Sequence, residues 1–133
     1  MISIIKANTN NVCLTLTEKT TVNIPIYLFS FTNPQSGTNK TFISADISSY
    51  KDRYNEFLII EKSVNPNNLI GEVTLSLEGY WNYEIYAQTS TTNLIVANAT
   101  QLVEKGKVYV VPSAIIDKAP ATSIYDTITT FNG

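Results

Sequence analysis

Side chains that branch at the β-carbon dominate this sequence. Val, Ile and Thr together account for 42 of its 133 residues. Branching at this carbon restricts the first side-chain torsion and suits the pleated surface of a sheet. Strong helix formers are not dominant, so the composition favours an all-β fold over a helical one. The length fits one domain.

Alternation of apolar and polar residues marks individual strands. It is clearest in residues 79–87, where every second side chain is apolar. We expect this face to be buried with neighbouring apolar residues, giving a core that contains Leu75, Leu77, Trp81, Tyr83, Ile85 and Val108. Other strands are predicted at residues 2–6, 12–17, 22–31, 41–45, 57–60, 73–77 and 107–111, with a helical turn within 46–53. About eight short strands separated by turn signals predict a β-sandwich or small barrel over residues 1–112.

Residues 113–133 have a different pattern. They carry six large apolar side chains with neither a helical nor a clean strand period, and Pro112 and Pro120 exclude them from a central strand. We therefore predict an extended C-terminal arm. Four apolar residues of this arm are expected to pack on a partner chain: Ile124, Tyr125, Ile128 and Phe131.

Several kinds of catalytic and metal site are excluded by composition. The chain has no His, so Ser–His and Cys–His arrangements and His-ligated metals are absent. The single cysteine, Cys13, cannot form an internal disulfide and is expected to be a partly buried strand residue. We predict no catalytic residue, no metal ligand and no cofactor, and therefore no enzyme.

The acidic residues are the remaining candidates for a catalytic site. Glycosidases need two facing carboxyl groups, and the candidates are Asp46, Asp52, Glu56 and Glu61. All four fall in and around one polar stretch, where a solvated face is the expected arrangement. Asp46 and Asp52 also lack the dense oxygen spacing of a calcium loop.

The charge and hydropathy patterns bear on nucleic acid and membranes. Nine basic and eleven acidic residues give a net charge of −2, without a basic stripe, so we expect no nucleic-acid partner. The longest apolar stretch, residues 24–31, is far below the ~18 residues of a spanning helix, so we expect no membrane partner. The first residues lack a basic region followed by an apolar core, and synthesis in a cytoplasm is expected.

Aromatic residues cluster within residues 80–86 and admit two interpretations. Tyr80, Trp81, Tyr83 and Tyr86 would bind sugars if they formed an exposed platform. The favoured interpretation is a core built on Trp81 and Tyr83, with Tyr80 and Tyr86 on the outer face or in a subunit contact.

Two segments carry a resemblance to a known family. Residues 79–86 read Gly-Tyr-Trp-Asn-Tyr-Glu-Ile-Tyr, and residues 102–110 read Leu-Val-Glu-Lys-Gly-Lys-Val-Tyr-Val. The pattern resembles small virion proteins of tailed bacteriophages, closest to structural proteins of crAss-like and related phages. This resemblance implies an immunoglobulin-like antiparallel β-sandwich with a structural role in the virion and no catalytic residues.

The resemblance also sets expectations for location and partners. We expect an auxiliary or decoration capsid protein of the virion, made in the host cytoplasm and present in many copies. Its partners would be the major capsid protein or neighbouring structural subunits. A tail or connector protein is the second location. A carbohydrate-binding or host-adhesion module is the alternative from a different class.

Overall fold

The computed structural model describes residues 1–112, 127, 128 and 130–132, and about half of them lie in strands. Two short 3-10 helices, η1 (Thr17–Lys19) and η2 (Val96–Asn98), are the only helical elements in this part of the chain. The strands are β1 (Ile2–Ile5), β2 (Thr9–Leu14), β3 (Ile26–Thr32), β4 (Asn39–Ser44), β5 (Asn55–Glu61), β6 (Glu72–Val73), β7 (Gly79–Gln88), β8 (Gln101–Val111), β9 (Thr127–Ile128) and β10 (Thr130–Asn132).

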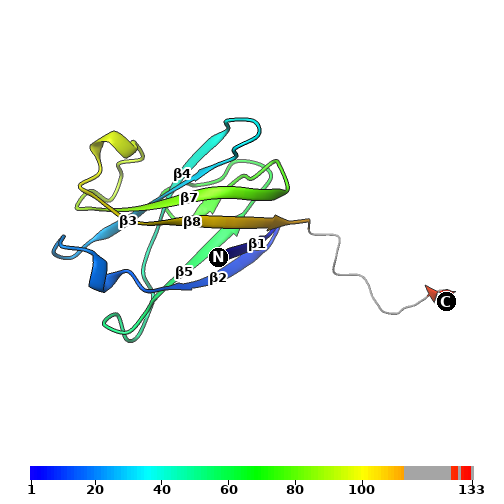
Figure 1. Cartoon of the computed structure of the whole chain (residues 1–133), viewed down its shortest axis with the longest axis horizontal. Coiled ribbons are helices and arrows are strands. Elements are labelled where there is room, and N and C mark those ends of the chain that lie inside the picture. The colour runs from blue at the N-terminus through cyan, green and yellow to red at the C-terminus, as the bar shows by residue number, and fades with distance from the viewer. Residues whose placement is uncertain (113–126, 129, 133) are drawn as a thin grey trace.

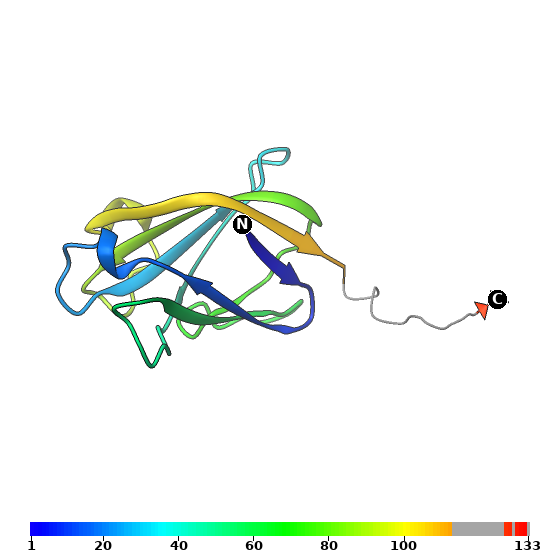
Figure 2. The same cartoon turned by 60° about the horizontal axis from the view of Figure 1, so that its bottom comes forward.

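Two sheets face each other across an apolar core (Figures 1 and 2). One has the strand order β1-β8-β7-β3-β4 and the other the order β2-β5-β6. Pairing β2 with β5 in one sheet and β3, β7 and β8 in the other reproduces the B–E and C–F–G pairing of immunoglobulin domains. The chain therefore forms an immunoglobulin-like β-sandwich. Within these two facing sheets, the strand pairings are antiparallel except β1–β8 and β5–β6, which are parallel.

The core forms where the inward faces of the two sheets meet. Trp81, Tyr83 and Ile85 of β7 are buried together with Leu75 and Val108, as their alternation predicts. The phenylalanines connect the layers, because Phe29 of β3 stacks on Phe42 of β4 at 5.0 Å and meets Phe57 of β5 edge-on at 5.1 Å. Such pairs add to the free energy gained by burial.

Strand β3 lies between β7 and β4, and residues 27–31 are all buried. Its predicted start at residue 22 is wrong, since the strand begins at Ile26. Pro25 cannot donate to a ladder, and Ile24 has a left-handed backbone with φ of 52°. Strand β8 begins at Gln101, six residues before the prediction, because it pairs with β7 as far as Ala87 through a bulge at Ile85 and Tyr86.

Three predicted environments are wrong. Leu77 is 40% exposed because β6 ends at Val73, so the alternation no longer places residue 77 inward. Cys13 is exposed because the β2 alternation turns its neighbour Val12 into the core. Glu61 is buried rather than solvated: its carboxylate accepts hydrogen bonds from the backbone N–H groups of Ala7, at 2.8 Å, and Leu75, at 2.9 Å.

Residues 46–53 contain no helix, although the Tyr54 N–H donates to the Tyr50 carbonyl across one turn. The C-terminal predictions are only partly covered by the structure. Ile124 and Tyr125 lie outside the described residues. Ile128 and Phe131 belong to β9 and β10, which pair in parallel and are described by their backbone alone.

Candidate functional site

Three long connections lie at one end of the sandwich, which we call the loop end. They are residues 15–25 between β2 and β3, residues 45–54 between β4 and β5, and residues 89–100 between β7 and β8. Figures 1 and 2 show them at the left, whereas β8 ends at the right. In immunoglobulin variable domains, the loops at one end of the sandwich form the binding surface.

A buried amide holds two of these loops together. Asn55, only 1% exposed, accepts hydrogen bonds from the backbone N–H groups of Leu16, at 2.6 Å, and Thr17, at 3.1 Å. Its side-chain amide donates to the Asp46 carboxylate at 2.6 Å. The same carboxylate accepts the N–H groups of Ser48 and Glu56. These bonds fix loop 15–25 against loop 45–54.

Two further amides fix the remaining connections. Gln88, also 1% exposed, donates to the carbonyls of Ser90 and Asn93 inside loop 89–100. Gln101 accepts the Thr21 N–H at 2.9 Å and donates to the Lys19 carbonyl at 3.0 Å, which ties loop 15–25 to β8. The sequence prediction missed Asn55, Gln88 and Gln101. Their position at strand ends beside polar loops is the signal that marks them.

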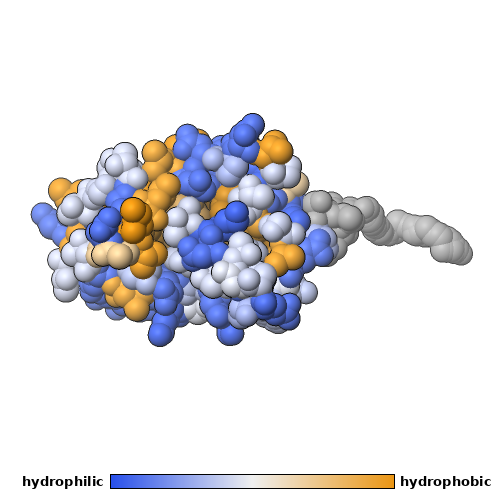
Figure 3. Space-filling model, turned by 90° about the horizontal axis from the view of Figure 1, so that it is seen from above, coloured by the Kyte–Doolittle hydropathy of each residue, from blue (hydrophilic) through white to orange (hydrophobic). Residues whose placement is uncertain are grey.

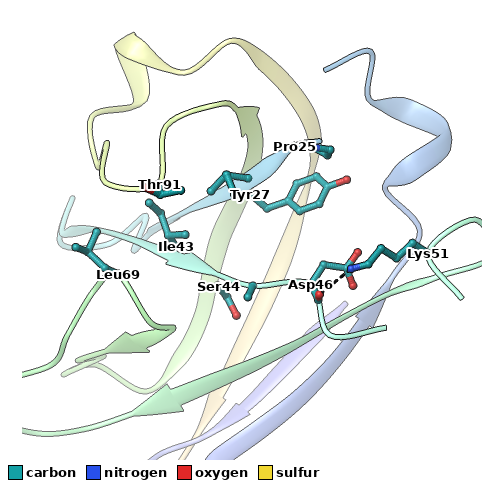
Figure 4. A pocket seen from close by; sticks show the side chains of 10 residues that line it. Pro25, Tyr27, Ile43, Ser44, Asp46, Lys51, Leu69 and Thr91 are labelled. Atoms are coloured by element: carbon teal, nitrogen blue, oxygen red, sulfur yellow. Dashed lines mark hydrogen bonds between the residues drawn. The ribbon is translucent and has the colours of Figure 1, made fainter. Parts of the chain in front are cut away.

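A cavity of about 340 Å³ lies at the loop end, and we call it the loop-end hollow. Figure 4 shows Ile43, Leu69 and Thr91 on one side and Tyr27, Asp46 and Lys51 on the other. The Lys51 ammonium donates to the Asp46 carbonyl at 3.1 Å. The hollow thus has an apolar wall and a polar rim that ends in an exposed cation.

The ionisable groups of the hollow are arranged for structure rather than for proton transfer. Burial, together with the nearby Asp46 carboxylate, raises the pKa of Tyr27. A neutral phenol and a carboxylate that already accepts three hydrogen bonds do not supply a nucleophile with its base.

Apolar side chains project from the loops around the hollow. Ile24, Ile47, Tyr50 and Ile95 are all exposed, and Ile24 is 81% exposed. A β-branched residue with positive φ is strained, so Ile24 is held outward at an energetic cost. In Figure 3, the largest group of hydrophobic atoms on the upper face lies toward this same end.

Lys19, Tyr83 and Glu104 form a charged cluster near the start of β8. The Tyr83 hydroxyl donates to the Glu104 carboxylate at 2.6 Å, and Lys19 donates to the other oxygen at 2.6 Å. Burial opposes ionisation of Glu104, but the hydrogen bonds from Lys19 and Tyr83 outweigh it and hold its pKa below the ordinary value. Burial, followed by the hydrogen bond to Glu104, raises the pKa of Tyr83. The cluster is a structural link.

The aromatic residues divide as the favoured interpretation predicts. Trp81 is fully buried, and its indole N–H donates to the Leu77 carbonyl. Tyr80 is 57% exposed and lies 4.8 Å from Tyr109 of β8, with the rings tilted by 55°. Tyr86 donates to Glu84, and burial with this partner raises the pKa of Tyr86 to about 12.

The predicted acidic candidates do not form one site. Asp46 stabilises the loops, and Glu61 is buried with its carboxylate bound to the Ala7 and Leu75 N–H groups. Asp52 is exposed, and Glu56 accepts a hydrogen bond from Asn11. Within the described residues, no three His, Cys, Asp or Glu side chains lie close enough together to hold a metal ion. None of the helices in this part of the chain has the length and apolar character to cross a membrane.

Comparisons with known proteins add little. No family model matches the chain, and no curated protein matches it. Among solved structures, it is similar to a proposed glycoside hydrolase from Bacteroides vulgatus ATCC 8482, with 11% identity and a TM-score of 0.45. The alignment covers 88% of this chain and 17% of the other. A likeness at this level carries no argument about fold or function.

Proposed function

We propose that this chain is a structural protein of a bacteriophage virion, an auxiliary or decoration capsid protein that binds neighbouring subunits. A position in the tail or connector is the alternative location. The proposed place in a virion comes from the resemblance of residues 79–86 and 102–110 to small virion proteins of tailed bacteriophages. The observation that carries the binding role is the loop end, where buried amides fix three loops that expose apolar side chains.

Fixed loops favour binding because less conformational entropy is lost when the partner arrives. The loops are rich in Thr, Ser and Asn and include exposed Tyr50. Binding loops of antibodies use a similar mixture of adaptable hydrogen bonding and aromatic contact. Low charge also reduces the cost of desolvating ions in an interface. These properties favour a protein partner.

The structural use of acidic groups supports a role without catalysis. Asp46, Glu61 and Glu104 each accept several hydrogen bonds that hold the fold together. A catalytic pair of carboxylates must instead face a substrate. The proposed role is therefore binding of other proteins at the surface, without catalysis.

Quantitative mass spectrometry of gradient-purified particles tests this proposal. We expect the chain in a fixed ratio to the major capsid protein. Ile95→Asp, at the loop end, should lower incorporation, whereas Leu58→Asp, on the exposed face of β5, should leave it unchanged. Absence of the wild-type chain from particles would refute the virion role, and equal incorporation of both variants would refute the loop end as the binding surface.

The Tyr80–Tyr109 pair supports carbohydrate binding as a second candidate function. Two adjacent exposed rings offer apolar faces to a sugar. A glycan array with the purified chain tests it, with Tyr80→Ala as the binding variant and Tyr50→Ala as the control. Binding that Tyr80→Ala alone abolishes would favour an adhesion module, and no binding to any glycan would remove this candidate.

A further inference from the structure

We propose that the loop-end hollow receives residues 124–131 of a second copy of this chain, so that copies join head to tail. This inference deepens the proposed function and rests on it, because it names one neighbour that the loop end binds. The hollow, the position of the β8 terminus and the chemistry of the C-terminal segment support it independently.

The hollow and the start of the C-terminal segment lie at opposite ends of the sandwich. Gln101 begins β8 beside loop 89–100, which contributes Thr91 to the hollow, and Val111 ends the strand. Eleven strand residues place these ends ~34 Å apart. Figure 2 shows β8 running from one end of the sandwich to the other. Binding between a segment that follows one end and a site at the other end is heterologous, and it generates rings or filaments.

A second copy fits this geometry better than the same chain. Residue 124 follows Val111 by 13 positions, so it can reach ~44 Å only when the intervening chain is fully extended. To enter its own hollow, the segment would have to follow the whole length of the sandwich with about 10 Å of slack. The hollow of a neighbouring copy imposes no such path.

The chemistry of the hollow matches the segment. Residues 119–133 contain four large apolar side chains and one charged residue, Asp126. The wall formed by Ile43 and Leu69 suits the apolar side chains, and the exposed Lys51 ammonium suits the Asp126 carboxylate. A volume of about 340 Å³ accommodates a few side chains but no folded domain.

The mode of binding follows from the adjacent strand. β4 is the outermost strand of its sheet, but its Ile43 N–H already donates to the Asn68 carbonyl at 2.7 Å. An incoming segment therefore cannot use that group to extend the sheet. We infer that side chains insert into the hollow instead of adding a strand at this point.

Analytical ultracentrifugation of the purified chain tests the proposal without particles. We expect the full chain to form oligomers as its concentration rises. Leu69→Asp damages the hollow, and deletion of residues 119–133 removes the segment, so each variant should be monomeric. Mixed together, they should form a one-to-one complex, because one supplies the segment and the other supplies an intact hollow.

The controls separate docking from unfolding. Leu77→Asp changes a residue that is also 40% exposed but lies just before β7, so it should self-associate like the wild type. Lys51→Glu is a second hollow variant, with an expected loss of affinity of at least about tenfold, in case Leu69→Asp does not fold. A monomeric full chain, or variants that fail to complement each other, would overturn the proposal. Both of these outcomes concern self-association alone. The presence of the chain in particles is tested separately, by the mass spectrometry described above.

Discussion

Gly71 shows how a single residue fixes the approach of two segments. Its φ of 84° is in the left-handed region, and a β-carbon there would lie 2.6 Å from the Leu58 carbonyl oxygen. Gly37 has a similar φ of 76° but open space around the same position. Left-handed backbone alone costs about 1–2 kcal/mol for other residues. Only Gly71 adds a backbone clash to that cost.

We predict that Gly71→Ala lowers the free energy of unfolding by at least about 3 kcal/mol, whereas Gly37→Ala lowers it by about 1–2 kcal/mol. Urea denaturation of both variants measures the difference. Equal losses would mean that the backbone of Gly71 can move away from Leu58 without cost.

For single residues, the sequence predicts which strand face is buried better than it predicts the burial of an individual polar side chain. Alternation correctly placed Trp81 and Ile85 in the core, since each lies in a long strand with one buried face. It could not place Glu61, because the N–H groups that satisfy this carboxylate come from Ala7 and Leu75, which are distant in sequence. Such long-range partners leave no local pattern.

Among the elements, β7 is the centre of the fold. It lies between β3 and β8, and its residue Trp81 is fully buried. We predict that Trp81→Ala lowers the free energy of unfolding by about 3–5 kcal/mol, the usual cost of deleting a large core aromatic. Tyr80→Ala on the opposite face of the same strand should cost less than about 1 kcal/mol. Thermal and urea unfolding measure both, and equal losses would contradict the assigned faces.

The loop between β7 and β8 depends on one amide. Gln88 is buried and donates to two carbonyls of residues 89–100. We predict that Gln88→Ala raises amide hydrogen exchange in this loop while residues 79–87 remain protected, because the strand keeps its ladder bonds. Gln35→Ala, in the exposed β3–β4 turn, is the control. Unchanged exchange would show that Gln88 does not hold the loop.

Strand prediction succeeded where alternation is long and failed where turns interrupt it. The strand that follows Gly79 was predicted from the sequence, and β7 includes Gly79 itself, whereas residues 74–77 were wrongly extended into a strand. The glycine and tyrosine in residues 79–86 and 102–110, the two segments that resemble phage virion proteins, also have a physical explanation. A β-carbon at Gly106 would lie 2.8 Å from the Tyr83 ring, whose hydroxyl reaches Glu104. These three residues form one unit that joins β7 to β8.

For the whole molecule, the Glu104 cluster makes stability depend on pH. Its pKa is lowered in the folded chain, so its contribution is complete above the unfolded pKa near ~4.3 and is lost as pH falls through the folded value. The raised pKa of Tyr83 acts at the other extreme, with stability present below pH ~10 and lost as pH rises further.

We therefore predict that the urea midpoint falls between pH 7 and pH 3, and that Glu104→Gln reduces this fall. Glu18→Gln removes an exposed carboxylate from the same region and serves as the control. An identical pH dependence in wild type and Glu104→Gln would show that Glu104 is not linked to folding.

The candidate site was less predictable than the fold. The sequence directed attention to the C-terminal segment, whereas the structure adds a loop end assembled from three connections. Asn55 and Gln101 are 46 residues apart in the sequence, yet both bind loop 15–25, at Leu16 and Thr21 respectively. A property that arises from the spatial arrangement of loops has no signature in hydrophobic periodicity.

Cryo-electron microscopy of purified particles tests most directly the proposal that this sandwich is a structural virion protein. We predict density for the sandwich at regularly repeated positions, with the loop end in contact with a neighbouring subunit. Particles of full composition that lack this density, or a sandwich whose loop end faces solvent at every position, would contradict it.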